Sequence, residues 1–376
     1  MRIAIDAGPL KSGHSVRGIG VHTRELLSAI QKVTKLPKYQ NTKIEAVDFS
    51  KADLSKYDIV HYQYFNPYFL TLPAFAKAPA RQAQKVIITI HDLIPLIYPE
   101  HYPPGTKGKY KFLIQKQLLK KVDAIITISE TSKKDICRFL GVNPNKVYVI
   151  PLAPRGIFKR IRKQELGIRV KNRYNLPDKF ALYVGDINYN KNIPTLIEAC
   201  KLSKIPLVIC GKQALEIEEK GIDIYSLKGP RDWARFLFGK PHPEIAHYRD
   251  VLSGVRSFKD VIRLGFVPDN DLVTIYNLAS LYIQSSFYEG FGLPILEAQA
   301  SGCPVVASRI QVHMEIAENS ALFADAKNAK DFAKKIKKVL DNSQFKDNLV
   351  SRGNKNVEDY SWSKTAKKTL QVYNSL

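Results

Sequence analysis

The sequence predicts an α/β protein with two domains, each built on a doubly wound parallel sheet. Three observations lead to this prediction. The chain has 376 residues, which is long for one hydrophobic core. Short apolar segments alternate with helix-like segments, first in one half of the chain and then in the other. The 45% hydrophobic content is ordinary for a globular protein.

In the first half, the strand-like segments are short apolar runs, and the segments between them have helical periodicity. The expected strands are Ile3–Asp6, Ile59–Tyr62, Val86–Ile90, Ala124–Ile128 and Val147–Ile150. The expected helices are Val21–Gln31, Lys107–Lys121 and Ser132–Leu140. A basic connecting segment, Pro151–Asn175, shows little alternation, so we place the first domain at residues 1–175.

The second domain, residues 176–359, repeats this alternation. Its expected strands are Phe180–Val184, Leu207–Cys210, Val261–Leu264, Leu281–Gln284 and Val305–Ala307. Its expected helices are Ile193–Lys201, Asn270–Ala279, Ile295–Ala300 and Ala329–Leu340. The insert Lys212–Lys259 is longer than a simple connection, and the pattern assigns no role to its Trp233, His242, His247 and Arg249.

The net charge of +23 is unevenly spread along the chain. Residues 1–175 carry 31 Lys+Arg and 12 Asp+Glu, whereas residues 176–376 carry 27 and 23. This asymmetry indicates an anionic partner for the first half, such as a lipid head-group surface, a pyrophosphate-linked acceptor or nucleic acid. The basic segment Lys107–Lys121 is either a solvated helix packed on its own sheet, the favoured interpretation, or a membrane-docking helix.

Several features that the sequence lacks indicate the cellular compartment in which we expect the protein. No apolar run approaches the roughly 20 residues that a membrane-spanning helix needs. The chain begins directly with a strand-like segment, so we expect no signal peptide. The four cysteines show no metal-ligand spacing and lie in apolar surroundings, which favours free thiols in a reducing compartment. We therefore expect a cytoplasmic protein, with the inner face of the membrane as a place where it can bind peripherally.

The most informative segment is residues 287–297, Phe-Tyr-Glu-Gly-Phe-Gly-Leu-Pro-Ile-Leu-Glu. It follows an apolar strand-like run and leads into a helix, so its backbone N–H groups can form an anion site at the helix start. The carboxylates Glu289 and Glu297 flank that site. A ligand with a diphosphate between two hydroxyl-bearing sugars, as in a nucleotide sugar, suits this arrangement. A tight turn with two solvated carboxylates is the alternative interpretation.

This segment and its continuation, residues 298–308, resemble the Glu-x7-Glu motif of glycosyltransferase family 4, in particular its mannosyltransferase-like group. The family has the GT-B fold: two Rossmann-like doubly wound domains face each other across a cleft, and the C-terminal helix crosses back to the first domain. Residues 360–366 resemble that helix, so residues 360–376 are assigned to the first domain. The resemblance implies a retaining transferase that moves a sugar, mannose among the candidates, from a nucleotide-diphosphate sugar to a hydroxyl of a glycan or lipid-linked acceptor.

The resemblance also implies roles for the donor-binding residues. Glu289 would contact the transferred sugar and Glu297 the ribose hydroxyls. Backbone N–H groups of the turn would bind the diphosphate. Lys191, in the loop after Gly185, would offset the diphosphate charge and stabilise the leaving group. The turn residues are Gly290, Phe291, Gly292 and Leu293, and Val267 belongs to a loop expected near the base.

Asp186 departs from the family pattern, because many relatives place an arginine at this point as a second phosphate ligand. Neutralisation of the diphosphate would then depend on Lys191, on backbone amides, and on an arginine from elsewhere in the chain. Asp186 would instead orient Lys191 or contact the acceptor. A non-catalytic sugar-binding relative is an alternative that this residue leaves open.

On the acceptor side, His91 and Asp92 follow an expected buried strand, at the edge where open α/β sheets bind ligands. His91 would bind the transferred sugar, and Asp92 would hold the tautomer of His91 or orient the acceptor. The Gly18, Ile19 and Gly20 turn resembles the first-loop motif of the family and would line the acceptor side. We interpret the nearby His22 as a surface or loop-supporting residue.

Two other function classes stay open at this stage. Another GT-B enzyme, such as a nucleotide-sugar epimerase or a phosphorylase, would share the fold. The isoelectric point of about 9.7 allows a nucleic-acid-binding protein, although the chain shows no recognisable nucleic-acid module, so no nucleic-acid partner is expected. No cofactor or metal ion is expected besides the donor substrate, and the chain contains no Asp-x-Asp motif.

Overall fold

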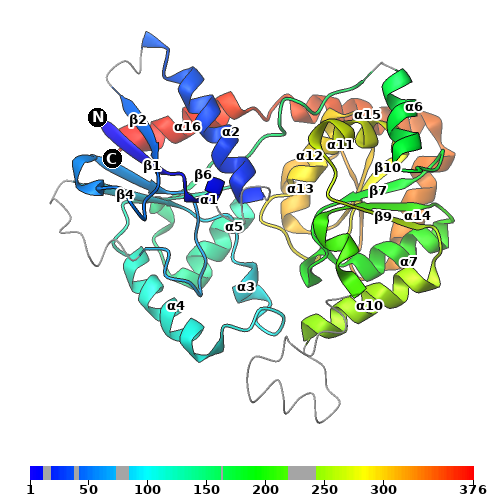
Figure 1. The fold of residues 1–376 in the computed structure, drawn as a ribbon, viewed down its shortest axis with the longest axis horizontal. Helices are drawn as coiled ribbons and strands as arrows, with labels where there is room; N and C mark the ends of the chain where they lie inside the picture. Colours follow the sequence, from blue (N-terminus) through cyan, green and yellow to red (C-terminus); the bar gives the residue numbers. More distant parts are fainter. Residues whose placement is uncertain (12–17, 38–41, 73–83, 162–163, 219–242) are drawn as a thin grey trace. The chain divides into compact units, whose positions relative to one another are not determined.

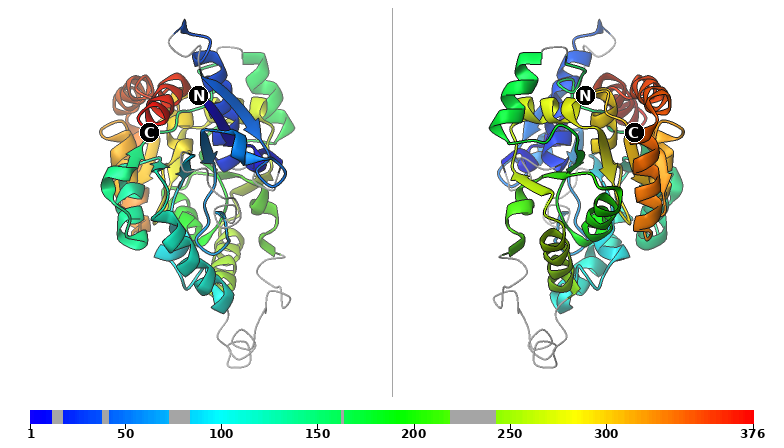
Figure 2. Two further views of the ribbon diagram at one scale, coloured as in Figure 1. Left: turned by 90° about the vertical axis from the view of Figure 1, so that its left-hand side faces the viewer. Right: turned by 90° about the vertical axis from the view of Figure 1, so that its right-hand side faces the viewer.

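The computed structural model describes residues 1–11, 18–37, 42–72, 84–161, 164–218 and 243–376. The chain forms two compact units (Figure 1). Unit 1 comprises Met1–Ala153 together with Tyr360–Leu376, and unit 2 comprises Pro154–Asp359. Each unit is an open parallel sheet with helices on both faces, which is the predicted α/β class (Figure 2).

The sheet of unit 1 has six parallel strands in the order β2-β1-β3-β4-β5-β6. The strands are β1 (Arg2–Asp6), β2 (Lys43–Val47), β3 (Ile59–Tyr62), β4 (Lys85–Thr89), β5 (Ala124–Thr127) and β6 (Val147–Val149). The helical segments include α1 (Gly8–Lys11), α2 (Gly18–Val33), α3 (Ile94–Ile97), α4 (Gly105–Leu119), α5 (Glu130–Asp135), the π-helical turn η4 (Ile136–Leu140) and α16 (Trp362–Asn374).

Alternating side chains of unit 1 serve two cores, because successive strand residues point to opposite faces. Ile3 and Ile5 of β1 pack in one cluster with Leu26 of α2 and Leu370 of α16. Ala4, between them, belongs to the other cluster, to which α4 and η4 contribute side chains. The helices α16 and α2 pack together, so the end of the chain completes the first unit (Figure 1 and Figure 2).

The sheet of unit 2 also has six parallel strands, in the order β12-β11-β10-β7-β8-β9. The strands are β7 (Ala181–Val184), β8 (Leu207–Cys210), β9 (Val261–Gly265), β10 (Leu281–Gln284), β11 (Val305–Ser308) and β12 (Leu322–Ala324). The helices include α6 (Gln164–Arg173), α7 (Ile193–Ser203), α10 (Pro243–Ser257), α11 (Asp269–Leu278), α12 (Leu293–Ala300), α13 (Gln311–Ala317), α14 (Ala329–Asp341) and α15 (Ser343–Val357).

One large core of unit 2 lies between its sheet and the helices α7, α10 and α14. The amphipathic pattern of α14 explains its place, since Phe332, Ile336 and Val339 are buried while the lysines of the same helix point outward. Several described elements escaped the sequence prediction: the strands β2 and β12, and the helices α1, α3, α6, α10, α13 and α15. The edge strand β2 is only partly buried, and α15 buries only Leu349 and Gly353, so neither shows a strong apolar period.

The division between the units falls after Ala153, earlier than the boundary predicted at residue 175. The reason is a set of contacts that the sequence does not reveal. The Ile161 backbone N–H donates to Asn277 Oδ1 at 2.8 Å, and Asn277 Nδ2 donates to the Lys159 carbonyl at 3.0 Å. The helix α6 packs against α11. Residues 154–175 therefore belong to unit 2.

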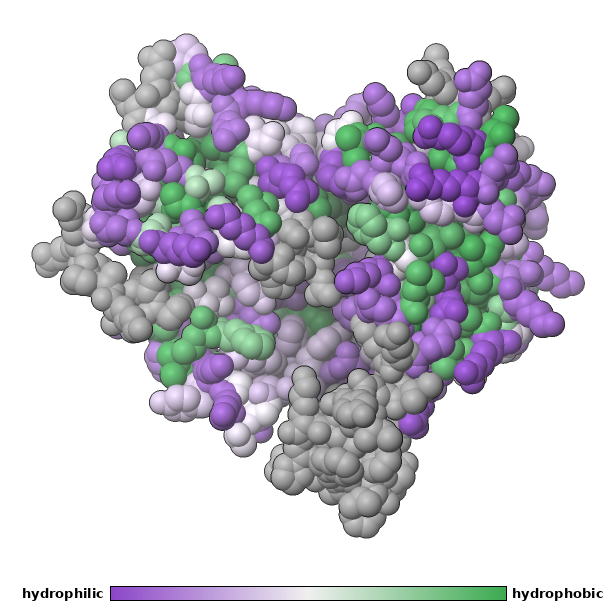
Figure 3. All heavy atoms as spheres, viewed as in Figure 1, coloured by the Kyte–Doolittle hydropathy of each residue, from purple (hydrophilic) through white to green (hydrophobic). Residues whose placement is uncertain are grey.

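The corrected division also changes the charge comparison. Unit 1 holds 26 Lys+Arg and 11 Asp+Glu, giving +15, and unit 2 holds 32 and 24, giving +8. Unit 1 is still the more basic one, but by less than predicted, because residues 154–175 carry eight basic residues and one acidic residue. Hydrophilic side chains cover much of the visible face of each unit, with hydrophobic patches between them (Figure 3).

Candidate functional site

The strand order of unit 2 locates its ligand-binding edge. From β7 the chain moves outward through β8 to β9 and then returns to β10, on the other side of β7. Connections on the two sides of this point therefore leave in opposite directions, which opens a crevice at the carboxyl ends of β7 and β10. The two loops that leave these ends hold Gly185, Asp186 and Lys191 on one side and Glu289 on the other.

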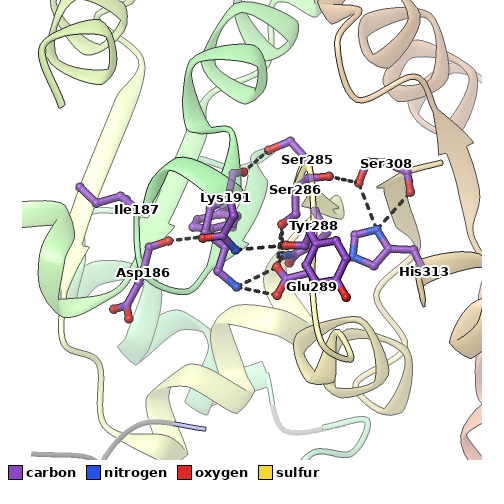
Figure 4. A network of polar contacts seen from close by, with 12 residues as sticks. Asp186, Ile187, Lys191, Ser285, Ser286, Tyr288, Glu289, Ser308 and His313 are labelled. Carbon is purple, nitrogen blue, oxygen red and sulfur yellow. Dashed lines mark hydrogen bonds and ion pairs between the residues drawn. The ribbon is translucent and has the colours of Figure 1, made fainter. Parts of the chain in front are cut away.

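Hydrogen bonds tie these two loops together (Figure 4). The Phe287 backbone N–H donates to the Asn190 carbonyl at 2.8 Å, and Asn190 Nδ2 donates to the Tyr288 carbonyl at 3.1 Å. Ser285 Oγ donates to the Lys191 carbonyl at 3.0 Å. Because both loops are fixed in this way, the side chains of Lys191 and its partner are held in place before any ligand arrives.

Lys191 and Glu289, two residues predicted to act in catalysis, form a direct ion pair. Lys191 Nζ donates to the Glu289 oxygens Oε1 and Oε2 at 2.7 and 2.8 Å. Gln284 Nε2 and Ser286 Oγ donate to Oε1 at 2.7 and 2.6 Å. Burial alone would raise the pKa of Glu289, but the ion pair with Lys191 and the bond from Ser286 outweigh it and hold this pKa below its ordinary value.

A second layer supports this pair from β11 and α13. Ser308 Oγ donates to the Ser286 carbonyl at 2.6 Å, and His313 Nδ1 lies 3.1 Å from Ser308 Oγ (Figure 4). Burial lowers the pKa of His313 to about 4, so this histidine is neutral at physiological pH. Gln284, Ser286 and His313 were not predicted, and only their spacing from the Glu-x7-Glu segment could have suggested them.

The glycine turn after β10 leads into α12 as predicted. Gly292 has a φ of 113°, and a Cβ atom built there would lie 2.9 Å from Ile316 Cδ1, so glycine is required at this position. The helix begins at Leu293, with a proline in its first turn. Gly290, Phe291, Gly292 and Leu293 therefore form the backbone of a helix N-terminus, where N–H groups and the helix dipole favour an anion.

Glu297 lies on α12, and its side chain is 7% exposed. Burial raises the pKa of Glu297 to about 7, although Arg155 acts to lower it. Arg155 Nε lies 3.5 Å from Glu297 Oε1. No local pattern indicated this arginine, because its contact with Glu297 joins residues far apart in the chain.

The remaining donor-side residues lie at the same edge of the sheet. Gly185 and Asp186 directly follow β7, and Tyr183 Oη donates to the Asp186 carbonyl at 2.5 Å. Figure 4 shows the Asp186 carboxylate turned away from the Lys191 ammonium group, so Asp186 does not orient Lys191 here. Val267 follows β9 and is buried.

In unit 1, His91 follows β4 and meets a second histidine. His22 Nδ1 lies 2.7 Å from His91 Nε2, so one nitrogen donates the shared proton and the other accepts it. His22 is buried against Trp362 of α16, with ring centroids 5.8 Å apart. Burial, followed by the neighbouring His91, holds the pKa of His22 well below its usual range. His22 therefore supports the His91 loop from within the core and is not a surface residue.

Asp92 and the glycines of the first loop take different local roles. Asp92 Oδ1 accepts the Ile94 backbone N–H at 3.1 Å, so it forms an Asx turn that leads into α3. Gly18, Ile19 and Gly20 form the first turn of α2 and do not precede it, because α2 begins three residues before the predicted helix. Of these three residues Gly18 is exposed and Gly20 is buried.

The long insert is described only in part. Trp233 and His242 lie outside the described residues, whereas α10 forms its last part. His247 Nε2 bonds the Ile187 carbonyl at 2.8 Å, which gives this buried histidine a structural role near the β7 loop. Within the described ranges, no group of three or more His, Cys, Asp or Glu side chains is placed to hold a metal ion. None of the helices in those ranges is long and apolar enough to cross a membrane.

Comparisons with known proteins agree with this geometry. Residues 33–153 match Glycosyltransferase Family 4, and residues 258–356 match Glycosyl transferases group 1. The O-antigen chain mannosyltransferase B of Escherichia coli is 26% identical over 306 residues, which cover 78% of this chain and 71% of the relative. The serotype-specific mannosyltransferase WbdA of Escherichia coli is 25% identical over 299 residues, but the match spans only 34% of that longer protein.

Solved structures share the whole fold. Sucrose-phosphate synthase from Thermosynechococcus elongatus has a TM-score of 0.71 at 18% identity, covering 100% of this chain and 98% of that one. Anabaena Alr3699/HepE in complex with UDP and glucose has a TM-score of 0.71 at 15% identity, with 100% of both chains covered. The fold and the paired motifs define a glycosyltransferase of the GT-B class. The family models thus match the first part of the chain to Glycosyltransferase Family 4 and the second part to Glycosyl transferases group 1.

Proposed function

We propose that this enzyme transfers a sugar, with mannose as the first candidate, from a nucleotide-diphosphate sugar to a hydroxyl of a glycan or lipid-linked acceptor, with retention at the anomeric carbon. The observation that carries the proposal is the position of the Lys191–Glu289 pair. It lies at the switch point of unit 2, beside the helix N-terminus that begins at Leu293. The match to O-antigen mannosyltransferases favours mannose and a role in polysaccharide biosynthesis.

The residues of the donor site have distinct proposed roles. The α12 N-terminus and the Gly290–Gly292 turn bind the diphosphate through backbone N–H groups. Lys191 offsets the charge that develops on the leaving diphosphate as the sugar bond breaks. Glu289 binds hydroxyls of the transferred sugar. Glu297 accepts hydrogen bonds from the ribose hydroxyls, which suit a single carboxylate.

The Lys191–Glu289 pair has a consequence for the order of events. In the structure both Glu289 oxygens accept from Lys191, so binding of the donor as proposed would redistribute these bonds. The diphosphate draws Lys191 toward its own oxygens, and sugar hydroxyls replace the ammonium group at Glu289. The ion pair thus keeps the carboxylate charged and oriented until the donor arrives, which is a form of preorganisation.

Chemistry on the transferred sugar needs positioning more than a protein base. In a retaining transfer of this kind the acceptor hydroxyl attacks from the side of the leaving group. The departing phosphate oxygen accepts the hydroxyl proton, so that the new glycosidic bond forms as the old one breaks. His91 is proposed to hydrogen-bond the sugar, while Asp92 and the Gly18–Gly20 turn serve the acceptor side. No metal or cofactor is part of this proposal.

A thermal-shift screen followed by product analysis tests this function. GDP-, UDP- and ADP-sugars are each added to the protein, since a ligand that binds the folded state raises the melting temperature. The sugar that binds is then incubated with glycan and lipid-linked acceptors, and the products are resolved by mass spectrometry and anomeric NMR. A product that forms without an acceptor would favour an epimerase. Transfer of the sugar to inorganic phosphate would favour a phosphorylase. Equal turnover by Glu289→Ala would contradict the site assignment.

The acceptor side of this proposal includes an anionic membrane surface on the cytoplasmic face. The helix α4 exposes Tyr110 and Leu113, whose exposed fractions are 68% and 61%, and Phe69 nearby is 62% exposed. Lys111 Nζ lies 5.6 Å from the Phe69 ring centroid, so apolar and basic groups share this surface. Co-sedimentation with vesicles of phosphatidylglycerol and phosphatidylcholine tests it: Leu113→Glu should release the protein, and equal binding to neutral vesicles would contradict it.

A further inference from the structure

The segment that opens unit 2, Pro154–Ile161, is fastened along α11. Its far end is held by two hydrogen bonds with Asn277, at Ile161 and Lys159. In its middle, the Phe158 ring meets the Tyr276 ring edge-on, with centroids 5.5 Å apart. This segment, called here the opening segment, is therefore held against α11 and is not a loose connection.

Arg155 of the opening segment lies between two carboxylates. Its Nη1 donates to Asp269 Oδ2 at 2.7 Å, and its Nε lies 3.5 Å from Glu297 Oε1. The guanidinium also lies over the Phe158 ring, 4.9 Å from the centroid. The Arg155 side chain is only 12% exposed, so packing on the ring and the bond to Asp269 hold the guanidinium beside Glu297.

We propose that Arg155 is a positioning residue for the nucleoside end of the donor site, where it holds Glu297 as an oriented carboxylate that accepts hydrogen bonds from the ribose diol. The inference rests on the proposed function, since it takes Glu297 as the ribose ligand. It gives the opening segment a contribution to donor binding that is separate from those of the Glu-x7-Glu motif and of the glycine turn before α12.

The surroundings of Glu297 explain why a cation is needed there. A carboxyl group buried on α12 is costly to ionise, yet only the ionised form acts purely as an acceptor at both oxygens, as the two hydroxyls of a diol require. Arg155 favours the charged form, as does the Tyr276 hydroxyl, whereas the carboxylate of Asp269 opposes it. Removal of Arg155 should therefore raise the pKa of Glu297, and removal of the Asp269 charge should lower it.

The test measures nucleoside diphosphate binding as a function of pH. GDP, UDP and ADP are titrated into wild type, Arg155→Met and Asp269→Asn by calorimetry between pH 5.5 and 8.5. For the nucleotide that binds, Arg155→Met should weaken binding at pH 7 by about tenfold or more, with the inflection of affinity moved to higher pH. Asp269→Asn removes the charge but keeps a carbonyl oxygen that can accept from Arg155 Nη1, so it should move that inflection to lower pH and tighten binding at pH 6.

Arg173→Met is the matched control. Arg173 also bonds an aspartate of α11, Asp271 at 3.0 Å, and lies over the ring of Tyr174, but no contact joins it to Glu297 in the described structure. This variant loses the same kind of ion pair and ring contact, so its nucleotide affinity and pH inflection should equal those of wild type. If it changed binding as much as Arg155→Met, a general loss of packing would explain both, and the inference would be wrong.

The outcomes separate this inference from the proposed function. If wild type binds none of the three nucleotides, the proposed function fails. If wild type binds one of them and Arg155→Met binds it with the same affinity and inflection, only the inference is overturned. Should Arg155→Met fail to fold by circular dichroism, Asp269→Asn decides: weaker or unchanged binding at pH 6 contradicts the positioning role, because a merely structural ion pair predicts no gain.

Discussion

Replacing Glu297 by glutamine should make the free enzyme more stable while it weakens donor binding. Glu297 is buried, and its pKa is raised from 4.5 to about 7 by burial, against the opposing influence of Arg155. The folded state therefore holds this proton more tightly than the unfolded chain does. Glutamine keeps the shape without the charge, and Arg155 keeps its partner Asp269 at 2.7 Å.

The size and pH window of the effect follow from the pKa difference. Below pH 4.5 the side chain is protonated in both states, so it contributes nothing. As the pH rises from 4.5 to about 7, the unfolded chain releases the proton first and the wild-type free energy of unfolding falls. Above pH 7 the cost is complete, at about 3 kcal/mol for the pKa difference of the two states. Glu297→Gln avoids this cost.

The assay is thermal unfolding of both proteins at pH 5 and pH 8. For a unit of this size the melting temperature of Glu297→Gln should exceed that of wild type by about 6–12 °C at pH 8, with little difference at pH 5. Nucleotide affinity at pH 8 should fall in the same variant, because the amide donates where the carboxylate accepts. Equal or lower stability of Glu297→Gln at pH 8 would refute the reasoning.

Three further predictions concern other residues. Glu289→Gln should lower the free energy of unfolding at pH 7 by about 3 kcal/mol, because it leaves Lys191 with an uncompensated charge. The difference from wild type should shrink as the pH falls below 4.5. Urea titrations at pH 7 and pH 4 measure this difference. His22→Phe should reduce kcat without changing donor affinity, because His91 loses its 2.7 Å partner; steady-state kinetics with an unchanged kcat would argue against a role for this pair. Gly211→Ala should lower the urea concentration at which unit 2 unfolds, because a Cβ atom would lie 2.1 Å from the backbone carbonyl oxygen of the turn after β7. An unchanged urea midpoint would contradict this.

The local elements of this protein follow from the sequence because their causes are local. Strands such as β4 and β10 are short buried apolar runs, and the glycine turn before α12 is encoded by residues that are neighbours in the chain. The family resemblance adds the GT-B architecture on the same residues. The weakly patterned elements β2 and α15 were missed, because half-exposed segments have little apolar periodicity to detect.

Only the tertiary structure decides which side chains meet. Lys191 and Glu289 are 98 positions apart, and the strand order that brings β7 beside β10 makes them an ion pair. Arg155 is part of a segment that was predicted to connect the domains and was assigned to the first one, yet it lies against Glu297 in unit 2. The composition and periodicity of a sequence record the preferences of each segment. The pairing of distant charges depends on the burial and register of the folded sheet, which no local pattern contains.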